Sequence, residues 1–211
     1  GMVGSGLVRF LKKNRNVELI TKDKKDLNLI KQVDVENFFK KQKIDQVYLA
    51  AARVGKRLHW IADNLKMNCY GIEPSVKAIE FANNKDVKVI KGTADVMNFE
   101  DKKFDFVIFG FCLYLCDRSD LFQIAKEADR VLKNTGYIII HDFYSPTPFV
   151  REYHHYPGIF SYKMDYRKLF DWHPNYQCVS HEVFTEDENE IKDDVNKWRA
   201  TSVLRKKNLD E

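Results

Sequence analysis

Cysteine is scarce in this sequence. The 211 residues include four, which are Cys69, Cys112, Cys116 and Cys178. Three of them lie in apolar surroundings, and the pair at positions 112 and 116 has no second pair at zinc-ligand spacing. So few cysteines exclude a disulfide framework as the organising feature of the fold. We therefore expect reduced thiols, no bound metal and a cytoplasmic protein.

Long hydrophobic runs are also absent. No apolar stretch approaches the roughly 20 residues that a helix needs to cross a bilayer, and the first residues lack the apolar core of a signal peptide. Neither sign of charge dominates, because 35 Lys and Arg stand against 31 Asp and Glu. A net charge of +4, spread along the chain, argues against nucleic acid as a partner. We expect no membrane association, and the oligomeric state is left open.

The hydrophobic content is 44%, which is enough for one domain with a substantial core. Residues 1–26 are basic and poorly periodic, so we predict an N-terminal arm there. A weak helical stripe follows over residues 27–41 and begins the predicted single domain, 27–211.

Strands and helices alternate regularly from about residue 47 to residue 140. Short apolar runs predict five strands, at 47–50, 68–72, 87–91, 104–109 and 137–140. Helical periodicity fills three of the gaps between them, most strongly after Asp117, where apolar residues form one continuous stripe. This alternation indicates an α/β fold with a mostly parallel sheet between two helical layers. Ligands of such folds bind outside the carboxyl ends of the strands.

The character of the sequence changes after the fifth predicted strand. Residues 143–174 are rich in aromatic residues and prolines and show little periodicity. A long segment of this kind at a strand's carboxyl end is more often functional than not, so we interpret it as a substrate-side insertion. Two final strands are predicted at 176–184 and 197–204, joined by an acidic turn.

The stretch from Val47 to Glu73 has the plan of a nucleotide-binding unit. A strand, a turn, a helix and a second strand are followed by an acid, Glu73, at the second strand's end. An acid about 20 residues beyond such a turn holds ribose hydroxyls in βαβ units. The turn itself, Ala51 to Gly55, lacks most of the glycines that this plan requires.

Five segments in order resemble the Rossmann-like S-adenosylmethionine-dependent methyltransferases. They are the strand–turn–helix at 47–62, the second-strand motif Cys69 to Ser75, the adenine-lining segment Gly92 to Phe99, the fourth-strand motif Phe104 to Phe109, and the last helix and fifth strand from Ala128 to Ile139. The resemblance implies a three-layer sandwich with an antiparallel C-terminal strand. It also implies S-adenosylmethionine as cofactor and methyl transfer to a small-molecule or medium-sized acceptor.

The resemblance assigns cofactor contacts residue by residue. They fall on Ala51, Arg53, Gly55, Glu73, Pro74, Ala94, Asp95, Phe109 and Gly110. Glu73 would accept from the ribose hydroxyls, and Asp95 or the backbone at Ala94 would meet the adenine amino group. The alternatives are a solvated loop acid for Glu73, a turn residue for Asp95 and a tight strand-to-helix turn at Phe109 and Gly110.

The first motif departs from the family at three positions. The family's acid is replaced by Leu49, and its first two glycines are replaced by Ala51 and Arg53. An inactive methyltransferase-like module for binding or assembly is therefore a second hypothesis. A nicotinamide-dependent oxidoreductase is a third, which fits segment 92–99 and the terminal strands less well.

The remaining candidates lie after the fourth and fifth predicted strands. His141 and Asp142 follow the fifth strand, and His154 and His155 lie in the aromatic insertion. Each is a candidate general base or orienting group for an acceptor, or otherwise a hydrogen-bonded loop residue. Candidate substrate contacts are Tyr114, Tyr153 and Tyr162, for which core packing is the alternative.

Overall fold

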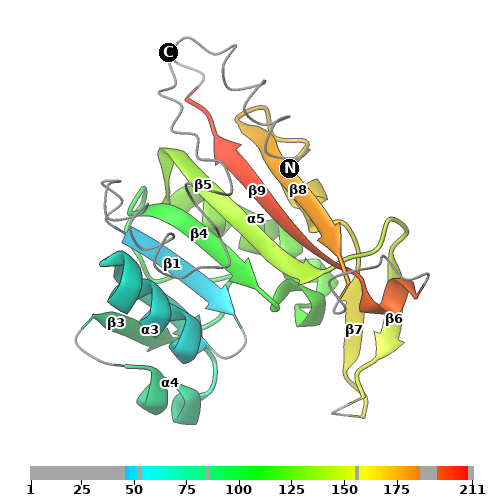
Figure 1. Cartoon of the computed structure of the whole chain (residues 1–211), viewed down its shortest axis with the longest axis horizontal. Coiled ribbons are helices and arrows are strands. Elements are labelled where there is room, and N and C mark those ends of the chain that lie inside the picture. Colours follow the sequence, from blue (N-terminus) through cyan, green and yellow to red (C-terminus); the bar gives the residue numbers. More distant parts are fainter. Residues whose placement is uncertain (1–45, 52–53, 84–85, 155–156, 186–193, 209–211) are drawn as a thin grey trace, which may run out of the picture.

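The computed structural model describes residues 46–51, 54–83, 86–154, 157–185 and 194–208. The predicted arm at 1–26 and helix at 27–41 lie outside these ranges, as do Arg53 and His155. Seven strands form one sheet in the order β3-β2-β1-β4-β5-β9-β8 (Figure 1). Their bounds are β1 Gln46–Ala51, β2 Asn68–Glu73, β3 Val87–Lys91, β4 Phe104–Gly110, β5 Leu132–Phe143, β8 Tyr176–Phe184 and β9 Arg199–Lys206.

The sheet is mixed. The pairings β3–β2, β2–β1, β1–β4 and β4–β5 are parallel. Strand β9 runs antiparallel to both of its neighbours, β5 and β8. The predicted α/β class and the antiparallel C-terminal strand are therefore confirmed, with β9 inserted between β5 and β8. The parallel pairings are restricted to the five strands from β3 to β5.

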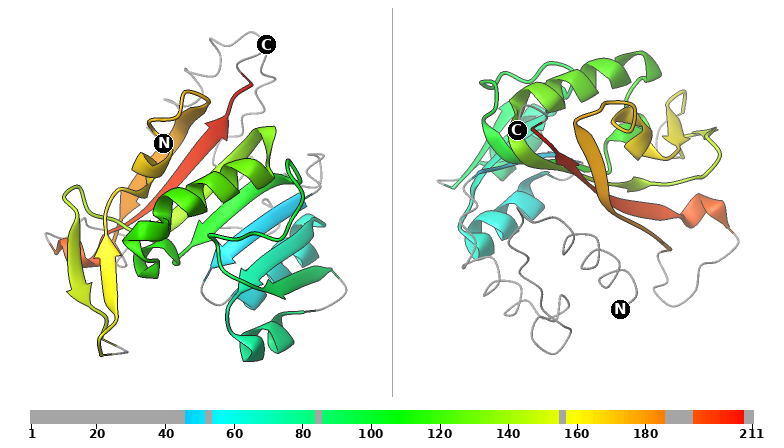
Figure 2. Two further views of the ribbon diagram at one scale, coloured as in Figure 1. Left: turned by 180° about the vertical axis from the view of Figure 1, so that it is seen from behind. Right: turned by 90° about the horizontal axis from the view of Figure 1, so that it is seen from above.

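Helices pack on both faces of the parallel strands. Helices α3 (Val54–Leu65) and α4 (Val76–Ala82) lie on one face, and α5 (Leu121–Val131) lies on the other (Figures 1 and 2). Strand β4 serves both faces because its side chains alternate. Phe106 and Ile108 pack against the α3 and α4 cluster, whereas Val107 and Phe109 belong to the α5 cluster.

The helix that the sequence predicts from Asp117 begins later. Two short 3₁₀ turns, η1 (Leu113–Leu115) and η2 (Arg118–Asp120), precede α5, and Asp117 makes no side-chain cap. The helix ends at Val131, and the chain enters β5 directly. β5 begins earlier than the strand predicted at 137–140, so Gly136 lies within it. A Cβ there would be 2.7 Å from Leu132 Cδ1 and 3.0 Å from Asp105 O. The absence of a side chain therefore lets β5 pack closely against the β4 backbone at Asp105.

The aromatic insertion contains regular structure that its sequence did not reveal. Strands β6 (Phe149–Glu152) and β7 (Phe160–Lys163) pair as a separate antiparallel hairpin, followed by the 3₁₀ turn η3 (Tyr166–Leu169). The hairpin projects beyond the ends of β8 and β9 (Figure 1). Within the described ranges, no helix has the length and hydropathy needed to cross a bilayer.

Candidate functional site

A cavity of about 420 Å³ opens at the carboxyl ends of β2 and β3, beside the segment that follows β4. Its size is typical of small-molecule sites. The register pairs Ala50 with Ile72 and Ala51 with Gly110, so β1, β2 and β4 end at the same edge of the sheet. The cavity is lined by Ile72, Glu73, Pro74, Gly92, Thr93, Ala94, Asp95, Phe111, Cys112, Leu115, Cys116, Asp117, Asp120 and Ile124.

Glu73 lies at the end of β2, where the turn into α4 holds its carboxylate. Glu73 Oε1 accepts from the Ser75 backbone N–H at 3.0 Å, while Ser75 Oγ accepts from Ala78 N–H and caps α4. The Glu73 carbonyl also accepts from Gly92 N–H at 3.3 Å. The bond from Ser75 N–H fixes Oε1, and no described residue hydrogen-bonds to Oε2, so Oε2 can accept from a ligand in the cavity that Glu73 lines.

The charge of the cavity wall is one-sided. Of the described residues that line it, four are acidic, namely Glu73, Asp95, Asp117 and Asp120, and none is basic. Apolar side chains supply most of the remaining wall. Such a site disfavours a pyrophosphate and favours a ligand with a positive charge and an apolar ring.

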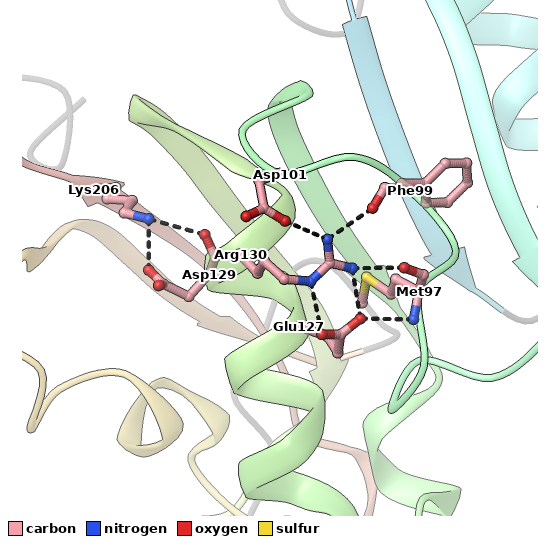
Figure 3. Close-up of polar contacts among 7 residues, drawn as sticks. All are labelled: Met97, Phe99, Asp101, Glu127, Asp129, Arg130 and Lys206. Carbon is pink, nitrogen blue, oxygen red and sulfur yellow. Dashed lines mark hydrogen bonds and ion pairs between the residues drawn. The ribbon is translucent and has the colours of Figure 1, made fainter.

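The segment after β3 is held by two charged residues of α5 (Figure 3). Arg130 donates from Nη2 to the Met97 carbonyl at 2.6 Å and from Nη1 to the Phe99 carbonyl at 2.7 Å. Glu127 Oε2 accepts from Met97 N–H at 2.9 Å, and its carboxylate also accepts from Arg130. Because Ala94 and Asp95 lie just before Met97, this network fixes one wall of the cavity.

The last turn of α5 carries ionised side chains that contact both the cavity wall and the sheet. Hydrogen bonds from Arg130 lower the pKa of Glu127 despite its partial burial, and Arg130 also pairs with Asp101 at 2.7 Å. On the neighbouring position of α5, Asp129 pairs with Lys206 of β9 at 2.8 Å (Figure 3). The last turn of α5 is therefore tied to the cavity wall on one side and to the C-terminal strand on the other.

The segment after β4 is clamped by Asp142. Its Oδ2 accepts from the N–H groups of Cys112 at 3.2 Å and Leu113 at 2.9 Å, and its Oδ1 accepts from Phe143 N–H at 2.8 Å. Phe111, which begins this segment, has φ of +52°, a strained value for a residue with a side chain. The carboxylate thus holds in place the strained segment that carries Phe111 and Cys112 into the cavity wall.

Asp142 is 2% exposed and does not line the cavity. Burial raises the pKa of Asp142 to about 7, although the N–H groups of Phe143, Leu113 and Cys112 favour its charged form. Both of its oxygens are occupied by backbone donors. Its geometry suits a positioning role in the segment after β4.

His141 lies on the opposite face of β5 from Asp142, because side chains alternate along a strand. Its Nδ1 is 2.8 Å from Thr201 Oγ1, and its ring meets Phe111 edge-on at 4.7 Å and stacks with Phe184 at 5.6 Å. His141 thus supports a residue of the cavity wall but does not itself line the cavity.

The three candidate substrate tyrosines lie around η1 and the insertion, and none lines the cavity. Tyr114 is buried and hydrogen bonds to Tyr153, and burial with this bond raises the pKa of Tyr114. Tyr162 lies under the Arg118 guanidinium, 4.2 Å from ring centroid to Cζ. His154 is exposed and contacts Tyr153 edge-on at 5.5 Å.

Arg118 connects the insertion to the segment after β4. Its Nη2 donates to the carbonyls of Leu113 at 2.6 Å and Cys116 at 2.5 Å, and its Nη1 donates to the Tyr166 hydroxyl at 3.3 Å. The insertion is therefore anchored to the same segment that forms the cavity wall.

The cavity brings together Glu73, Pro74, Ala94 and Asp95, four of the predicted cofactor contacts. Phe109 is fully buried in the α5 core, and Gly110 immediately precedes the lining residue Phe111. Ala51 ends β1 and Gly55 lies in the first turn of α3. Sequence reasoning missed the lining residues from Phe111 to Asp120, because they lie in loops and short 3₁₀ turns without periodicity. The motif from Ala128 to Lys133 contained Arg130 but gave no sign of what it binds.

Two of the missed residues are cysteines. Burial raises the pKa of Cys116 to about 11 and raises that of Cys112 further above its usual value. Both are therefore thiols at neutral pH and poor nucleophiles. Within the described residues, no group of three or more His, Cys, Asp or Glu side chains has the arrangement of a metal site.

Comparison with known protein families agrees with this geometry. The family described as "Methyltransferase domain" matches residues 50–140. A solved structure of a SAM-dependent methyltransferase from Methanosarcina mazei is 14% identical, with a TM-score of 0.61 over 86% of this chain and 99% of that chain. A Haloferax volcanii putative methyltransferase, solved in complex with the Trm112 activator, is 12% identical, with a TM-score of 0.60 over 82% and 89% of the two chains.

Curated sequences give a second, local similarity. GDP-L-fucose synthase from Escherichia coli is 49% identical over 55 residues, and GDP-L-fucose synthase 1 from Arabidopsis thaliana is 46% identical over 55 residues. Each match covers 26% of this chain and 17% of the relative. The chain thus spans less than a fifth of the length of these two relatives.

Proposed function

We propose that the chain is a Rossmann-like S-adenosylmethionine-dependent methyltransferase that transfers a methyl group to a small-molecule or medium-sized acceptor. The match of the methyltransferase-domain family to residues 50–140 and the fold shared with solved methyltransferases support this proposal. The observation that carries the proposal is the acid-lined, partly apolar cavity at the ends of β2 and β3. S-adenosylmethionine supplies an electrophilic methyl group on a sulfonium cation. The described part of the wall has four carboxylates and no basic residue, which suits a cofactor of that charge.

The chain's own residues fit the adenosine part of that cofactor. Among the described residues, only Ser75 N–H bonds to the Glu73 carboxylate, through Oε1, so Oε2 can accept from a ribose hydroxyl. Asp95 and the backbone at Ala94 also line the cavity, and they would accept from an adenine amino group. Ile72, Leu115 and Ile124 supply apolar surface for the ring.

Direct displacement of a methyl group needs alignment and water exclusion more than acid–base help. Asp142 holds the segment with Phe111 in place through backbone N–H groups, and Arg118 anchors the aromatic insertion to that segment. We assign positioning roles to both. His141, His154 and His155 stay candidate bases, and Tyr114, Tyr153 and Tyr162 stay candidate substrate contacts.

The second candidate is a methyltransferase-like module without activity, and the departures at Leu49, Ala51 and Arg53 favour it. A ligand panel separates the two candidates. S-adenosylhomocysteine is expected to raise the melting temperature, whereas NAD and NADP leave it unchanged because their phosphates meet carboxylates. If none of the three ligands stabilises the protein, the inactive module is favoured. In that case, restoring an acid at 49 and glycines at 51 and 53 tests whether the turn caused the loss.

A further inference from the structure

A second cavity of about 330 Å³ lies on another side of α5, between this helix and the segment from η3 to β8. It is lined by Phe122, Ala125, Lys126, Asp129, Leu169, Phe170, Trp172, His173 and Tyr176. No residue is shared with the first cavity, for which α5 contributes Ile124. The proposed methyl transfer does not use it.

The walls of this second cavity are aromatic. Trp172 and His173 meet edge-on at 5.5 Å, His173 meets Tyr176 at 5.5 Å, and Tyr176 meets Phe170 at 5.2 Å. Phe122, which α5 contributes to the cavity, is 70% exposed, and Trp172 is 64% exposed. Large exposed aromatic side chains beside a cavity mark interaction sites, and their faces favour stacking with another planar ring.

The charged side chains around the cavity favour a ligand with a negative charge. Asp129 is already neutralised, since its carboxylate pairs with Lys206 at 2.8 Å and accepts from the Tyr176 hydroxyl at 2.7 Å. Lys126 is exposed and makes no ion pair or hydrogen bond with any residue in the described ranges. His173 Nδ1 accepts from Asn175 N–H at 3.2 Å, so Nε2 is the ring nitrogen that can donate to a ligand.

We propose that this cavity binds a planar aromatic compound with a carboxylate. The ring would stack against Trp172 and Phe122, and the carboxylate would meet Lys126 and the His173 Nε2–H. A neutral ring binds through stacking alone, and a cationic ring is disfavoured by Lys126.

Nuclear magnetic resonance of the tryptophan side-chain N–H groups tests the proposal with indole-3-carboxylate, indole and tryptamine as probes. The chain has three tryptophans, Trp60, Trp172 and Trp198, and Trp172→Phe identifies the relevant signal. Indole-3-carboxylate is expected to shift the Trp172 signal and leave Trp60 unchanged. Its affinity should exceed that of indole by about threefold to fivefold, as one partly exposed ion pair provides.

Two variants and one competitor make the result decisive. Lys126→Gln should remove the advantage of the carboxylate and leave indole binding unchanged, whereas Phe122→Ala should weaken both probes. Saturation with S-adenosylhomocysteine should not alter the titration. The proposal is overturned if the Trp172 signal does not move, if tryptamine binds as well as indole-3-carboxylate, or if S-adenosylhomocysteine competes. None of these results bears on the proposed methyl transfer.

Discussion

Arg130 and Glu127, one turn apart on α5, bind the backbone carbonyl and the backbone N–H of the same residue, Met97. Arg130 Nη2 lies 2.6 Å from the Met97 carbonyl oxygen, and Glu127 Oε2 lies 2.9 Å from the Met97 nitrogen. The two side chains are joined at 2.8 Å. A helix on one face of the sheet thereby determines where the wall with Ala94 and Asp95 lies.

Replacement of Arg130 tests this link. Arg130→Lys keeps the charge but cannot reach Glu127, Phe99 and Met97 together, because an ammonium lacks the planar fork of a guanidinium. We expect a loss of about 2–3 kcal/mol in the free energy of unfolding, with weaker S-adenosylhomocysteine binding. Lys133→Met is the matched control. Its more exposed pair with Asp105 should cost less than about 1 kcal/mol. Equal losses in urea unfolding of the two variants would contradict the role of Arg130.

Replacement of Glu73 should weaken ligand binding without changing the stability of the fold. Glu73→Gln should weaken S-adenosylhomocysteine binding about tenfold, because a charged acceptor of ribose hydroxyls contributes more than a neutral one. The melting temperature without ligand should change little. Glu80→Gln removes an exposed acid from α4 and should leave the affinity unchanged. A Glu73 variant that binds as tightly as the native protein would remove this residue from the site.

The raised pKa of Asp142 predicts that the free energy of unfolding depends on pH. Its pKa is about 7 in the fold and near 4 in an unfolded chain, so between these values the folded state holds the extra proton. Its contribution is therefore complete below about pH 4 and is lost as the pH rises to 7, by on the order of 4 kcal/mol. Asp142→Asn should remove that part of the slope.

Urea unfolding of the native protein and the Asp142 variant from pH 4.5 to 8 measures the difference directly. Other titrating groups contribute alike to the stability of both proteins, so they do not affect the difference between them. The lowered pKa of His181 gives a slope of opposite sign in both proteins, and the lowered pKa values of Glu127 and Asp165 act in more acidic solution. Parallel slopes for the two proteins would show that Asp142 is ionised in the fold throughout.

Arg118 should control how firmly the insertion is attached. Arg118→Lys loses the simultaneous bonds to Leu113 and Cys116 and the stacking on Tyr162, so we expect a loss of about 2 kcal/mol. Limited proteolysis should then cut the β6–β7 hairpin faster. Arg151→Lys, on the exposed part of β6, is the control. Unchanged cleavage in the Arg118 variant would mean that the insertion is held by other contacts.

Much of the fold could be predicted because its strands are short segments rich in apolar and β-branched residues. The observed β3 spans Val87–Lys91 and β8 spans Tyr176–Phe184, as predicted. The start of α5 was predicted too early because two 3₁₀ turns, which have no periodic pattern, lie between β4 and the first residue of the helix. The β6–β7 hairpin was missed because it lies outside the main sheet and has one largely exposed strand.

The candidate site was predictable where one residue stands at a strand end, as for Glu73. It was not predictable where the chain folds back over long separations. Asp142 bonds to Cys112 and Arg130 bonds to Phe99, about 30 residues away in each case, and no local pattern encodes such a pair. The cavity wall at Phe111 and Cys112 depends on the first of these anchors, and the wall at Ala94 and Asp95 depends on the second.

Calorimetric titration of the native protein with S-adenosylhomocysteine tests the central claim most directly. The account predicts a single site with a dissociation constant in the range of about 1–100 μM, which weakens in the Glu73 and Arg130 variants. No heat and no thermal stabilisation at millimolar ligand would contradict it, and would leave this chain with the scaffold of a methyltransferase but without its cofactor.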